Sequence, residues 1–411
     1  MYKRKKYSII TILSCQDTAE MYNHLPVIRD KKLMLNCLKR GIYILYYASA
    51  ELRADREIVL EAVKDNGYAL EHASVKLRAD REIVLMAVKN DGHALQFASE
   101  ELRADREIVL AAVKNEGYAL IHANTSLKND SEVVLNAVKT DGRALEFAST
   151  KLRANREIVL TSVKKYGHML KYASKELRAD FEIVLTAVKN TGYALEYASE
   201  ELRADREIVL EAVKNYGYYA LKYASDALKN DREIVLEAVK IDAFALTHAN
   251  ALLKNDREFI LEAVKFCQDV LEFSSAELWA DREIILEAVK NKGVALEYAS
   301  TELKNDREIV LEAVKNKGTA LEFASKELQD DRAIVLEAVK NKGKALQYAS
   351  VILRDDCEIV LTAIKNCGSV LKYASVILCD CEIVLTTIKN CDSILKYASS
   401  RLQKKFKRLI N

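Results

Sequence analysis

The sequence contains little of what ends helices or spans membranes. Pro26 is the only proline in 411 residues, so the long remainder of the chain has no residue that must break a helix. No stretch approaches the roughly 18 consecutive apolar residues that a membrane span needs. The sequence therefore predicts a helical chain with no membrane span.

Motifs of catalytic and cofactor sites are also missing. The chain has six histidines, and it shows no nucleophile elbow, phosphate-binding loop or paired metal-ligand motif. We therefore expect no enzyme, with no catalytic residue, no cofactor and no metal ion. Charge is nearly balanced, with 63 Lys and Arg against 61 Asp and Glu. The formal net charge of +2 argues against nucleic acid as a partner, because such domains usually carry a clear positive excess.

The eight cysteines do not form a disulfide or zinc pattern. Equivalent positions in stacked helical repeats lie about 9 Å apart, too far for a disulfide, and a single Cys-x-Cys lacks the paired spacing of a zinc site. Free thiols indicate a reducing compartment, so we expect a cytoplasmic location. Five cysteines lie near the C-terminus: Cys357, Cys367, Cys379, Cys381 and Cys391.

What the chain does have is a period of 25 residues. All but one of its twelve glycines occupy a single slot of this period: Gly67, Gly92, Gly117, Gly142, Gly167, Gly192, Gly217, Gly293, Gly318, Gly343 and Gly368. Such a period is typical of solenoids, in which each unit buries its apolar face against its neighbours. The sequence predicts an all-α solenoid, an α-solenoid of about fifteen two-helix repeats.

The first helix of each repeat is well marked. In the repeat that begins at Leu52, Asp55 is placed to cap the helix N-terminus, and the apolar positions from Ile58 to Val63 predict burial on two sides. Gly67 suits the left-handed residue that ends many helices. A second helix is expected near residues 68–76. Three positions lack the glycine, and we expect their turns to be differently built: Ala243, Gln268 and Asp392.

The two ends depart from the repeat. We interpret residues 1–26 as a degenerate N-terminal capping unit, residues 27–402 as the repeat array and residues 403–411 as a basic C-terminal tail. Basic residues before the apolar run at residues 7–13 are similar to a signal peptide, but no cleavage-site pattern follows. We interpret each basic cluster as a solvated end of the array, with a nuclear address as the alternative.

The repeat string D-R-E-I-V-L-x-A-V-K-x-x-G-x-A-L-x-Y-A-S resembles the DUF4116 family, a domain of unknown function found as tandem helical repeats. The resemblance covers almost the whole chain. It implies a helical repeat scaffold, and it supplies no catalytic residue, cofactor or partner. Departures from the string occur at Gln268, Ser274 and Ala333.

Two ladders run through all the repeats. The lysine ladder lies at the end of the first helix, where it complements the helix dipole and lies two turns from the Glu57 slot. The aromatic ladder is interpreted as filling the joint between repeats, with a groove of stacking surfaces as the alternative. Its members are Tyr47, His72, Phe97, His122, Phe147, Tyr172, Tyr197, Tyr223, His248, Phe273, Tyr298, Phe323, Tyr348, Tyr373 and Tyr397.

A third feature is local and therefore more informative about a binding site. The Glu61 slot varies in early repeats and is then glutamate in six successive repeats, which we call the glutamate strip: Glu211, Glu237, Glu262, Glu287, Glu312 and Glu337. Such a strip is either a solvated face or a binding face for a basic segment. The favoured function is a non-catalytic scaffold for protein-protein interaction, with a protein or peptide partner. The alternative is a nucleic-acid-binding helical repeat protein.

Overall fold

The computed structural model describes residues 27–374, which divide into two compact units, one ending at Ala212 and the other beginning at Val213. The boundary falls inside α12 (Arg206–Tyr223), which is two helices joined across a kink at Tyr216. The predicted capping unit at residues 1–26, the basic tail at 403–411, Asp392 and three cysteines, Cys379, Cys381 and Cys391, lie outside the described residues.

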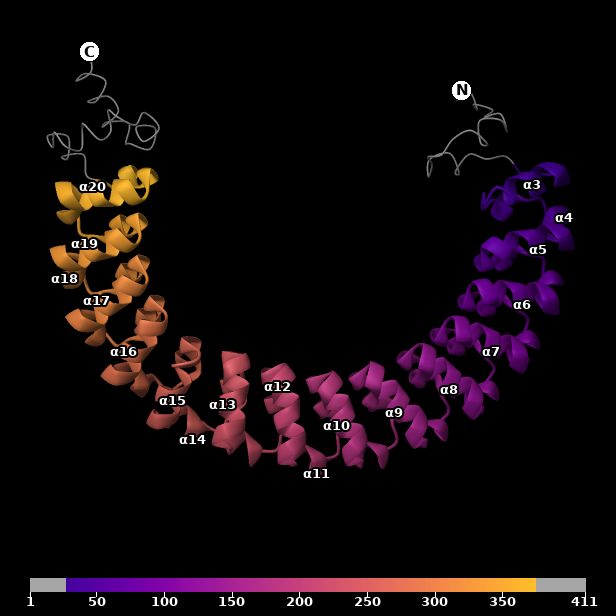
Figure 1. Cartoon of the computed structure of the whole chain (residues 1–411), viewed down its shortest axis with the longest axis horizontal. Coiled ribbons are helices and arrows are strands. Elements are labelled where there is room, and N and C mark those ends of the chain that lie inside the picture. The colour runs from indigo at the N-terminus through magenta and orange to yellow at the C-terminus, as the bar shows by residue number, and fades with distance from the viewer. Residues whose placement is uncertain (1–26, 375–411) are drawn as a thin grey trace, which may run out of the picture. The chain divides into compact units, whose positions relative to one another are not determined.

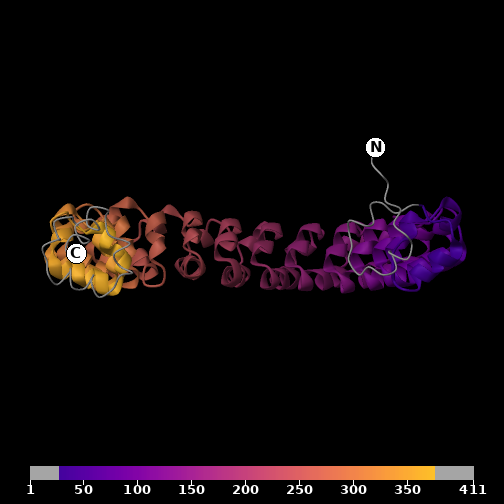
Figure 2. The same cartoon turned by 90° about the horizontal axis from the view of Figure 1, so that it is seen from above.

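Most repeats contain an α-helix, a six-residue 3₁₀ helix and one further helical turn; the 3₁₀ helix after α3 (Lys31–Leu38) has three residues, and α12 extends through this position. The repeat of α5 (Arg56–Asp65) continues into η2 (Gly67–His72) and η3 (Leu77–Ala79). Within each unit the helices stack side by side in chain order (Figures 1 and 2). The predicted all-α solenoid is confirmed. Among the described residues, strand-like pairing is limited to one isolated bridge between Ile28 and Ala48.

The α-helices of the first unit, before α12, are α3 (Lys31–Leu38), α4 (Ala50–Arg53), α5, α6 (Arg81–Asn90), α7 (Arg106–Asn115), α8 (Ser131–Thr140), α9 (Arg156–Lys165), α10 (Phe181–Asn190) and α11 (Glu200–Arg203). Those of the second unit, after α12, are α13 (Arg232–Ile241), α14 (Ala251–Lys254), α15 (Arg257–Ala263), α16 (Arg282–Asn291), α17 (Arg307–Asn316), α18 (Lys326–Gln329), α19 (Arg332–Asn341) and α20 (Cys357–Asn366).

The six-residue 3₁₀ helices follow the α-helices and form the second layer of each repeat. They are η2, η4 (Gly92–Phe97), η6 (Gly117–His122), η8 (Gly142–Phe147), η10 (Gly167–Tyr172), η12 (Gly192–Tyr197), η14 (Ala243–His248), η15 (Gln268–Phe273), η17 (Gly293–Tyr298), η19 (Gly318–Phe323), η20 (Gly343–Tyr348) and η22 (Gly368–Tyr373).

The α-helices begin as predicted. The Asp55 carboxylate accepts the backbone N–H groups of Glu57 and Ile58, which have no partner inside the helix. Such a cap stabilises a helix by about 1 kcal/mol relative to alanine. Asn155 replaces the aspartate in α9 and still accepts the N–H of Ile158. The N-cap role of this slot is therefore confirmed.

The core runs through the α-helices as an unbroken apolar layer. In α5, Ile58, Val59 and Val63 are fully buried and Ala62 is 3% exposed. Leu60 is only half-buried, so the apolar sector is narrower than the sequence predicted. A ten-residue helix is marginal alone, so its stability comes from this burial against the neighbouring repeats.

The second helix is shorter and more tightly wound than expected. The 3₁₀ helix η2 ends at His72, and Ala73 is already extended, with ψ of 153°. The cause is a backbone hydrogen bond, because the N–H of Ser74 donates to Arg53 O, at the start of the same repeat, at 2.9 Å. This bond closes each repeat on itself and recurs along both units.

The glycine slot has a different role from the one predicted. Gly41 is the one described glycine with positive φ, so the repeat glycines do not supply a left-handed turn. A Cβ placed on Gly67 would lie 2.3 Å from the carbonyl oxygen of Ala87 in the next repeat. The glycine is therefore required because two backbones approach too closely for a side chain.

Ala243 shows what happens when the glycine is missing. By the repeat spacing, its Cβ faces the position of Ala263 in α15. That helix has seven residues instead of the usual ten, and its last turn is tightened by a bond from Phe266 N–H to Ala263 O. The turn itself is built as in the glycine repeats, with Asp242 at φ of −154° and ψ of 115° and the usual six residues in η14, so the expectation of a differently built turn is wrong at Ala243. It is also wrong at Gln268, where Cys267 has φ of −147° and ψ of 109° and η15 again has six residues.

We predict that Gly318→Ala destabilises the second unit, because its Cβ would lie 2.2 Å from Ala338 O and 3.0 Å from Lys342 N. Overpacking of this kind costs about 1–3 kcal/mol. Urea unfolding followed by circular dichroism measures the loss, with Thr319→Ala on the same 3₁₀ helix as the control. Equal midpoints for the two variants would show that close approach does not set the repeat contact.

Candidate binding surface

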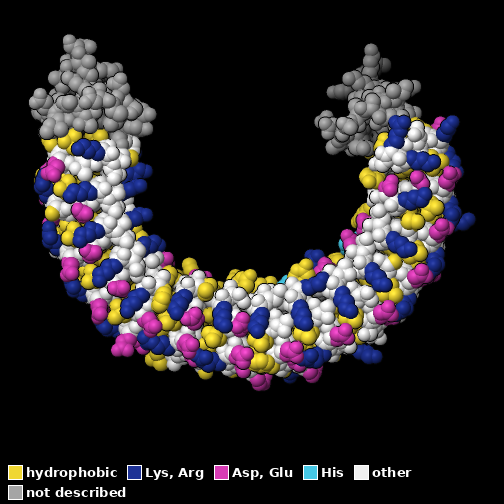
Figure 3. Space-filling view, viewed as in Figure 1, with side chains coloured by type: hydrophobic (Ala, Val, Ile, Leu, Met, Phe, Trp, Pro, Cys, Tyr) yellow, Lys and Arg dark blue, Asp and Glu magenta, His cyan; other side chains and the backbone are white. Residues whose placement is uncertain are grey.

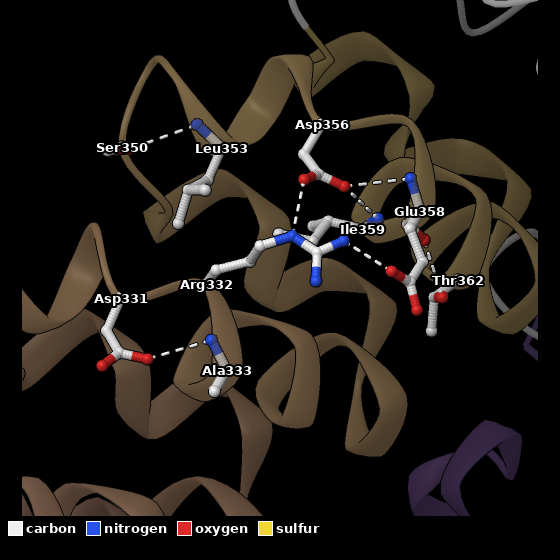
Figure 4. Close-up of polar contacts among 9 residues, drawn as sticks. All are labelled: Asp331, Arg332, Ala333, Ser350, Leu353, Asp356, Glu358, Ile359 and Thr362. Carbon is white, nitrogen blue, oxygen red and sulfur yellow. Dashed lines mark hydrogen bonds and ion pairs between the residues drawn. The ribbon is translucent and has the colours of Figure 1, made fainter.

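One polar ladder joins successive repeats at the starts of their α-helices. Arg332, the first residue of α19, donates to Asp356 and Glu358 of the next repeat (Figure 4). The same slot recurs with aspartate and glutamate partners 24 and 26 residues onward, as for Arg282 with Asp306 and Glu308. The arginine of one repeat and the aspartate and glutamate of the next therefore encode an inter-repeat ion pair, although the uncharged residues Ser131, Phe181 and Cys357 replace the arginine in three of the described repeats.

The aspartate in this ladder has two roles. Asp356 caps α20 by accepting the N–H groups of Glu358 and Ile359, and it also accepts from Arg332 Nε at 2.9 Å. Burial acts to raise the pKa of Asp356, but the Arg332 guanidinium and the Ile359 N–H outweigh it and lower that pKa. Because the Arg332 side chain is 52% exposed, the pair itself contributes only about 0.2–1 kcal/mol.

In a second row of cations, some side chains donate hydrogen bonds to carbonyl oxygens within the stack. Arg53 donates to the carbonyl oxygens of Tyr46 and Ala48, at the end of the preceding 3₁₀ helix. Lys128 donates to Ile121 O at 2.7 Å in the same way. These contacts satisfy carbonyls that the short helices leave unpaired.

An asparagine clamp holds the glycine slot. The Asn90 side chain accepts the Gly67 N–H at 2.9 Å and donates to Lys64 O at 3.1 Å, so it bridges from the end of α6 to the preceding repeat. Sequence reasoning missed this residue, because its partners are 23 and 26 residues away and neither is a charged side chain. The clamp recurs at Asn115, Asn190, Asn316, Asn341 and Asn366.

The glutamate strip and the lysine ladder form one feature. In α13, Glu237 pairs with Lys240 at 2.6 Å, and in α17, Glu312 pairs with Lys315 at 2.8 Å. Glu262 instead pairs with Arg232 of the preceding repeat at 3.0 Å. The ladder lysines thus contact the Glu61 slot, not the more distant Glu57 slot. Glu287 and Glu337 lie at 3.8 Å from the lysines of their own helices, and Glu211 is half-buried in α12.

The aromatic ladder lies in the joint between repeats. Its described members are half-buried, and Tyr397 lies outside the described residues. Several of them pack beside a ring from the preceding repeat, as Phe97, Phe147 and Phe273 do. The Tyr68 and Phe97 ring centroids are 5.0 Å apart, and those of Tyr118 and Phe147 are 4.9 Å apart, both edge to face. Such pairs contribute about 0.5–1.5 kcal/mol beyond their burial. The geometry supports the joint interpretation over an open stacking groove.

We predict that histidines in the ladder make stability depend on pH. Burial lowers the pKa of His72, His122 and His248. Their stabilising effect is present above the unfolded pKa of about 6.5 and is lost as pH falls through the folded values. Replacing all three by phenylalanine, the residue of other repeats, should reduce the fall in melting temperature between about pH 7 and 5.

Tyr172→Phe is the control for this experiment, since it changes the same slot without removing a histidine. Differential scanning fluorimetry across the pH range compares the variants. A triple variant whose melting temperature falls as steeply as that of the unaltered chain would contradict the assignment of the pH response to these rings.

A further row was not singled out from the sequence. In the first unit the residue after each repeat glycine is mostly aromatic or imidazole, and we call this the post-glycine row: Tyr68, His93, Tyr118, Arg143, His168 and Tyr193. Tyr68 is 42% exposed, and the Arg143 guanidinium lies over the rings of Tyr118 and Tyr166 at 5.5 and 5.7 Å. In the second unit the row becomes non-aromatic from Asp269 onward. The change from aromatic to non-aromatic residues is visible in the sequence and could have revealed the post-glycine row.

Other kinds of site have little support in the part of the chain that the structure describes. Across residues 27–374 no group of three or more His, Cys, Asp or Glu could hold a metal ion. Over the same residues, no helix is long and apolar enough to cross a membrane. The cysteines at positions 37, 267, 357 and 367 are free thiols. An open hollow of about 680 Å³ lies beside α18, where Lys326, Gln329 and Tyr348 line it. Ser350 and Asp330 also line it, and the Ser350 hydroxyl donates to the Asp330 carboxylate.

The fold and these ladders define an α-solenoid repeat protein. The chain belongs to the DUF4116 family, whose description is a domain of unknown function. No curated protein matches the chain. The family matches residues 30–78, 80–128, 105–153, 130–178, 155–203, 180–229, 205–251, 231–279, 281–329 and 331–379.

Proposed function

We propose that the chain is a non-catalytic repeat scaffold that binds a segment of another protein across several repeats. One observation carries this proposal. The slots that recur in nearly every repeat are engaged in holding the stack together, while the residues that vary lie in exposed or half-exposed rows. A solenoid presents such rows at a regular spacing, which suits an extended partner.

Charge supports a protein partner over nucleic acid. The Arg332-type residues are paired with carboxylates, so that row is not available as a phosphate-binding surface. In the Arg53 row, Arg53 and Arg153 donate to carbonyl oxygens within the stack. Figure 3 shows acidic side chains distributed among the basic ones along the visible face. Nucleic acid is the second candidate, because the aromatic post-glycine row of the first unit offers rings for base stacking.

The glutamate strip is the proposed face for a basic segment. In the second unit its carboxylates are between 32% and 42% exposed. Their pairs with lysine are exposed ion pairs, which contribute about 0.2–1 kcal/mol each. A lysine or arginine of the partner can therefore replace the internal cation at a small cost in free energy.

We predict that Glu237→Gln, Glu262→Gln and Glu287→Gln together slow the association of a lysine-rich peptide. Loss of complementary charge acts mainly on the association rate and its salt dependence. Stopped-flow anisotropy with a labelled lysine-rich peptide measures this rate. The control variant is Asn136→Lys, Thr161→Lys and Thr186→Lys, which makes the same change in net charge at the same slot of repeats that lack glutamate.

Two results would contradict this proposal. Equal association rates for the two triple variants would make the strip a solvated face. Tight binding of a single-stranded RNA oligonucleotide, with affinity that collapses as salt rises, would favour the nucleic-acid candidate.

A further inference from the structure

Among the described residues of the second unit, one row of four lysines contains only one ion pair, whereas the neighbouring lysines are all paired with glutamates. The residue before the repeat glycine varies in the first unit, where Asp91, Glu116 and Asp141 are acidic and the other members are uncharged. In three repeats of the second unit it is lysine, at Lys292, Lys317 and Lys342. Lys344 follows the last of these glycines. We call these four residues the pre-glycine lysine row. All four are exposed.

The neighbouring lysines of the same helices are different. Lys290, Lys315 and Lys340, two residues earlier, each pair with a glutamate of their own helix. In the pre-glycine lysine row, Lys292 pairs with Asp269 at 3.4 Å. Within residues 27–374, Lys317, Lys342 and Lys344 have no ion-pair partner. The row therefore carries positive charge that the internal pairs do not cancel.

The backbone under the row is fixed. Lys292, Lys317 and Lys342 have nearly identical conformations, with φ of −147°, −142° and −145° and ψ of 105°, 103° and 106°. The glycine that follows each of them donates its N–H to the asparagine of the next repeat, at 2.8, 2.7 and 3.1 Å. Each side chain therefore leaves the stack in the same direction, so the spacing of the row is that of the repeats.

The positive charges of the pre-glycine lysine row also act on a residue of the next repeat. Cys367 occupies the pre-glycine position after α20, and a hydrogen bond with Ser369 lowers the pKa of its thiol. The positive charges of Lys344 and Lys342 lower that pKa further. The positive potential of the row therefore extends from the end of α19 to the end of α20. Figure 3 shows Lys and Arg side chains projecting along this part of the chain.

The spacing suits an extended peptide. Packed helices lie about 8–10 Å apart, so successive lysines are separated by about that distance. A polyproline II segment advances about 9.3 Å in each three-residue turn, which places every third side chain on one face. Carboxylates at every third residue would therefore meet successive lysines without stretching either partner.

Nucleic acid fits this surface less well. Single-stranded nucleic acids are held by basic grooves that also carry aromatic rings for base stacking. In these repeats the post-glycine positions are Val294, Thr319 and Lys344, with no ring.

We propose that Lys292, Lys317, Lys342 and Lys344 form a docking row for an acidic, extended protein segment with Asp or Glu at every third residue. This inference rests on the proposed scaffold function and names a second kind of partner for it. The acidic segment would lie along the repeats of α16, α17 and α19.

The test uses the full chain and two labelled peptides of equal composition. One peptide has glutamate at every third position among prolines and serines, and the other has the same glutamates in one block. Fluorescence anisotropy at low salt should show tighter binding of the spaced peptide. Lys292→Gln, Lys317→Gln and Lys342→Gln together should weaken that binding about tenfold, as expected for three exposed ion pairs.

The matched control is Lys290→Gln, Lys315→Gln and Lys340→Gln, which removes the same charge from the same helices. This control should weaken binding by much less. Equal loss in both variants would overturn the row as a site and leave only a diffuse field, and unchanged binding in the row variant would also overturn it. Equal binding of the two peptides would overturn the three-residue register.

Other occupants give distinct results. Tighter binding of single-stranded RNA than of the spaced peptide, abolished in the row variant, would assign the row to nucleic acid and overturn the acidic-segment proposal. Self-association of the unaltered chain that the row variant loses would assign the row to a second copy. The lysine-rich peptide experiment on the glutamate strip is independent, so failure here leaves the scaffold proposal standing.

Discussion

The close approach of two backbones determines the rest of each repeat contact. Gly67 lies against Ala87 O of the next repeat with no room for a Cβ between them. This contact fixes the distance between consecutive helices, and the small Ala62-type residues in the α-helices are buried in the same layer. After Ala243, which replaces the glycine, α15 has seven residues, whereas after Gln268, which also replaces it, α16 keeps the usual ten.

The polar ladders depend on that spacing. Arg332 reaches Asp356 and Glu358 because the next helix begins at a fixed distance, and the asparagine clamp requires the same register. Each of these surface contacts is individually weak. Repeated along the stack, they penalise any slip in register, because one slip would break the same contact in every repeat. The ladders therefore contribute specificity more than stability.

Local features were predictable from the sequence and non-local ones were not. The N-cap role of Asp55 and the burial of Ile58 follow from spacing within one helix, and both are confirmed. The repeat glycine was predicted to supply a left-handed turn, but it is required by a close backbone approach. Both conditions select glycine, so the sequence does not distinguish them. The asparagine clamp at Asn90 was missed, since its partners belong to another repeat.

The candidate site was predictable to a similar extent. The glutamate strip was recognised as a run, but its pairing with the lysine ladder was not. From the sequence we described the glutamate strip and the lysine ladder separately, whereas in the structure Glu312 lies beside Lys315. The aromatic ladder was correctly interpreted as a joint, because interchange of His and Phe in one slot indicates partial burial.

The exposed rows that differ between the units distinguish one part of the chain from another. A slot that is identical in every repeat cannot tell a partner where along the stack to bind, however well it is exposed. Tyr68 and Tyr118 belong to a row that is aromatic in the first unit, and Lys317 belongs to a row that is basic only in the second. Since the packing contacts are nearly the same in each repeat, the free energy that selects a binding position must come from such changing rows. A segment that recognises them would therefore bind at one register along the solenoid rather than slide between equivalent repeats.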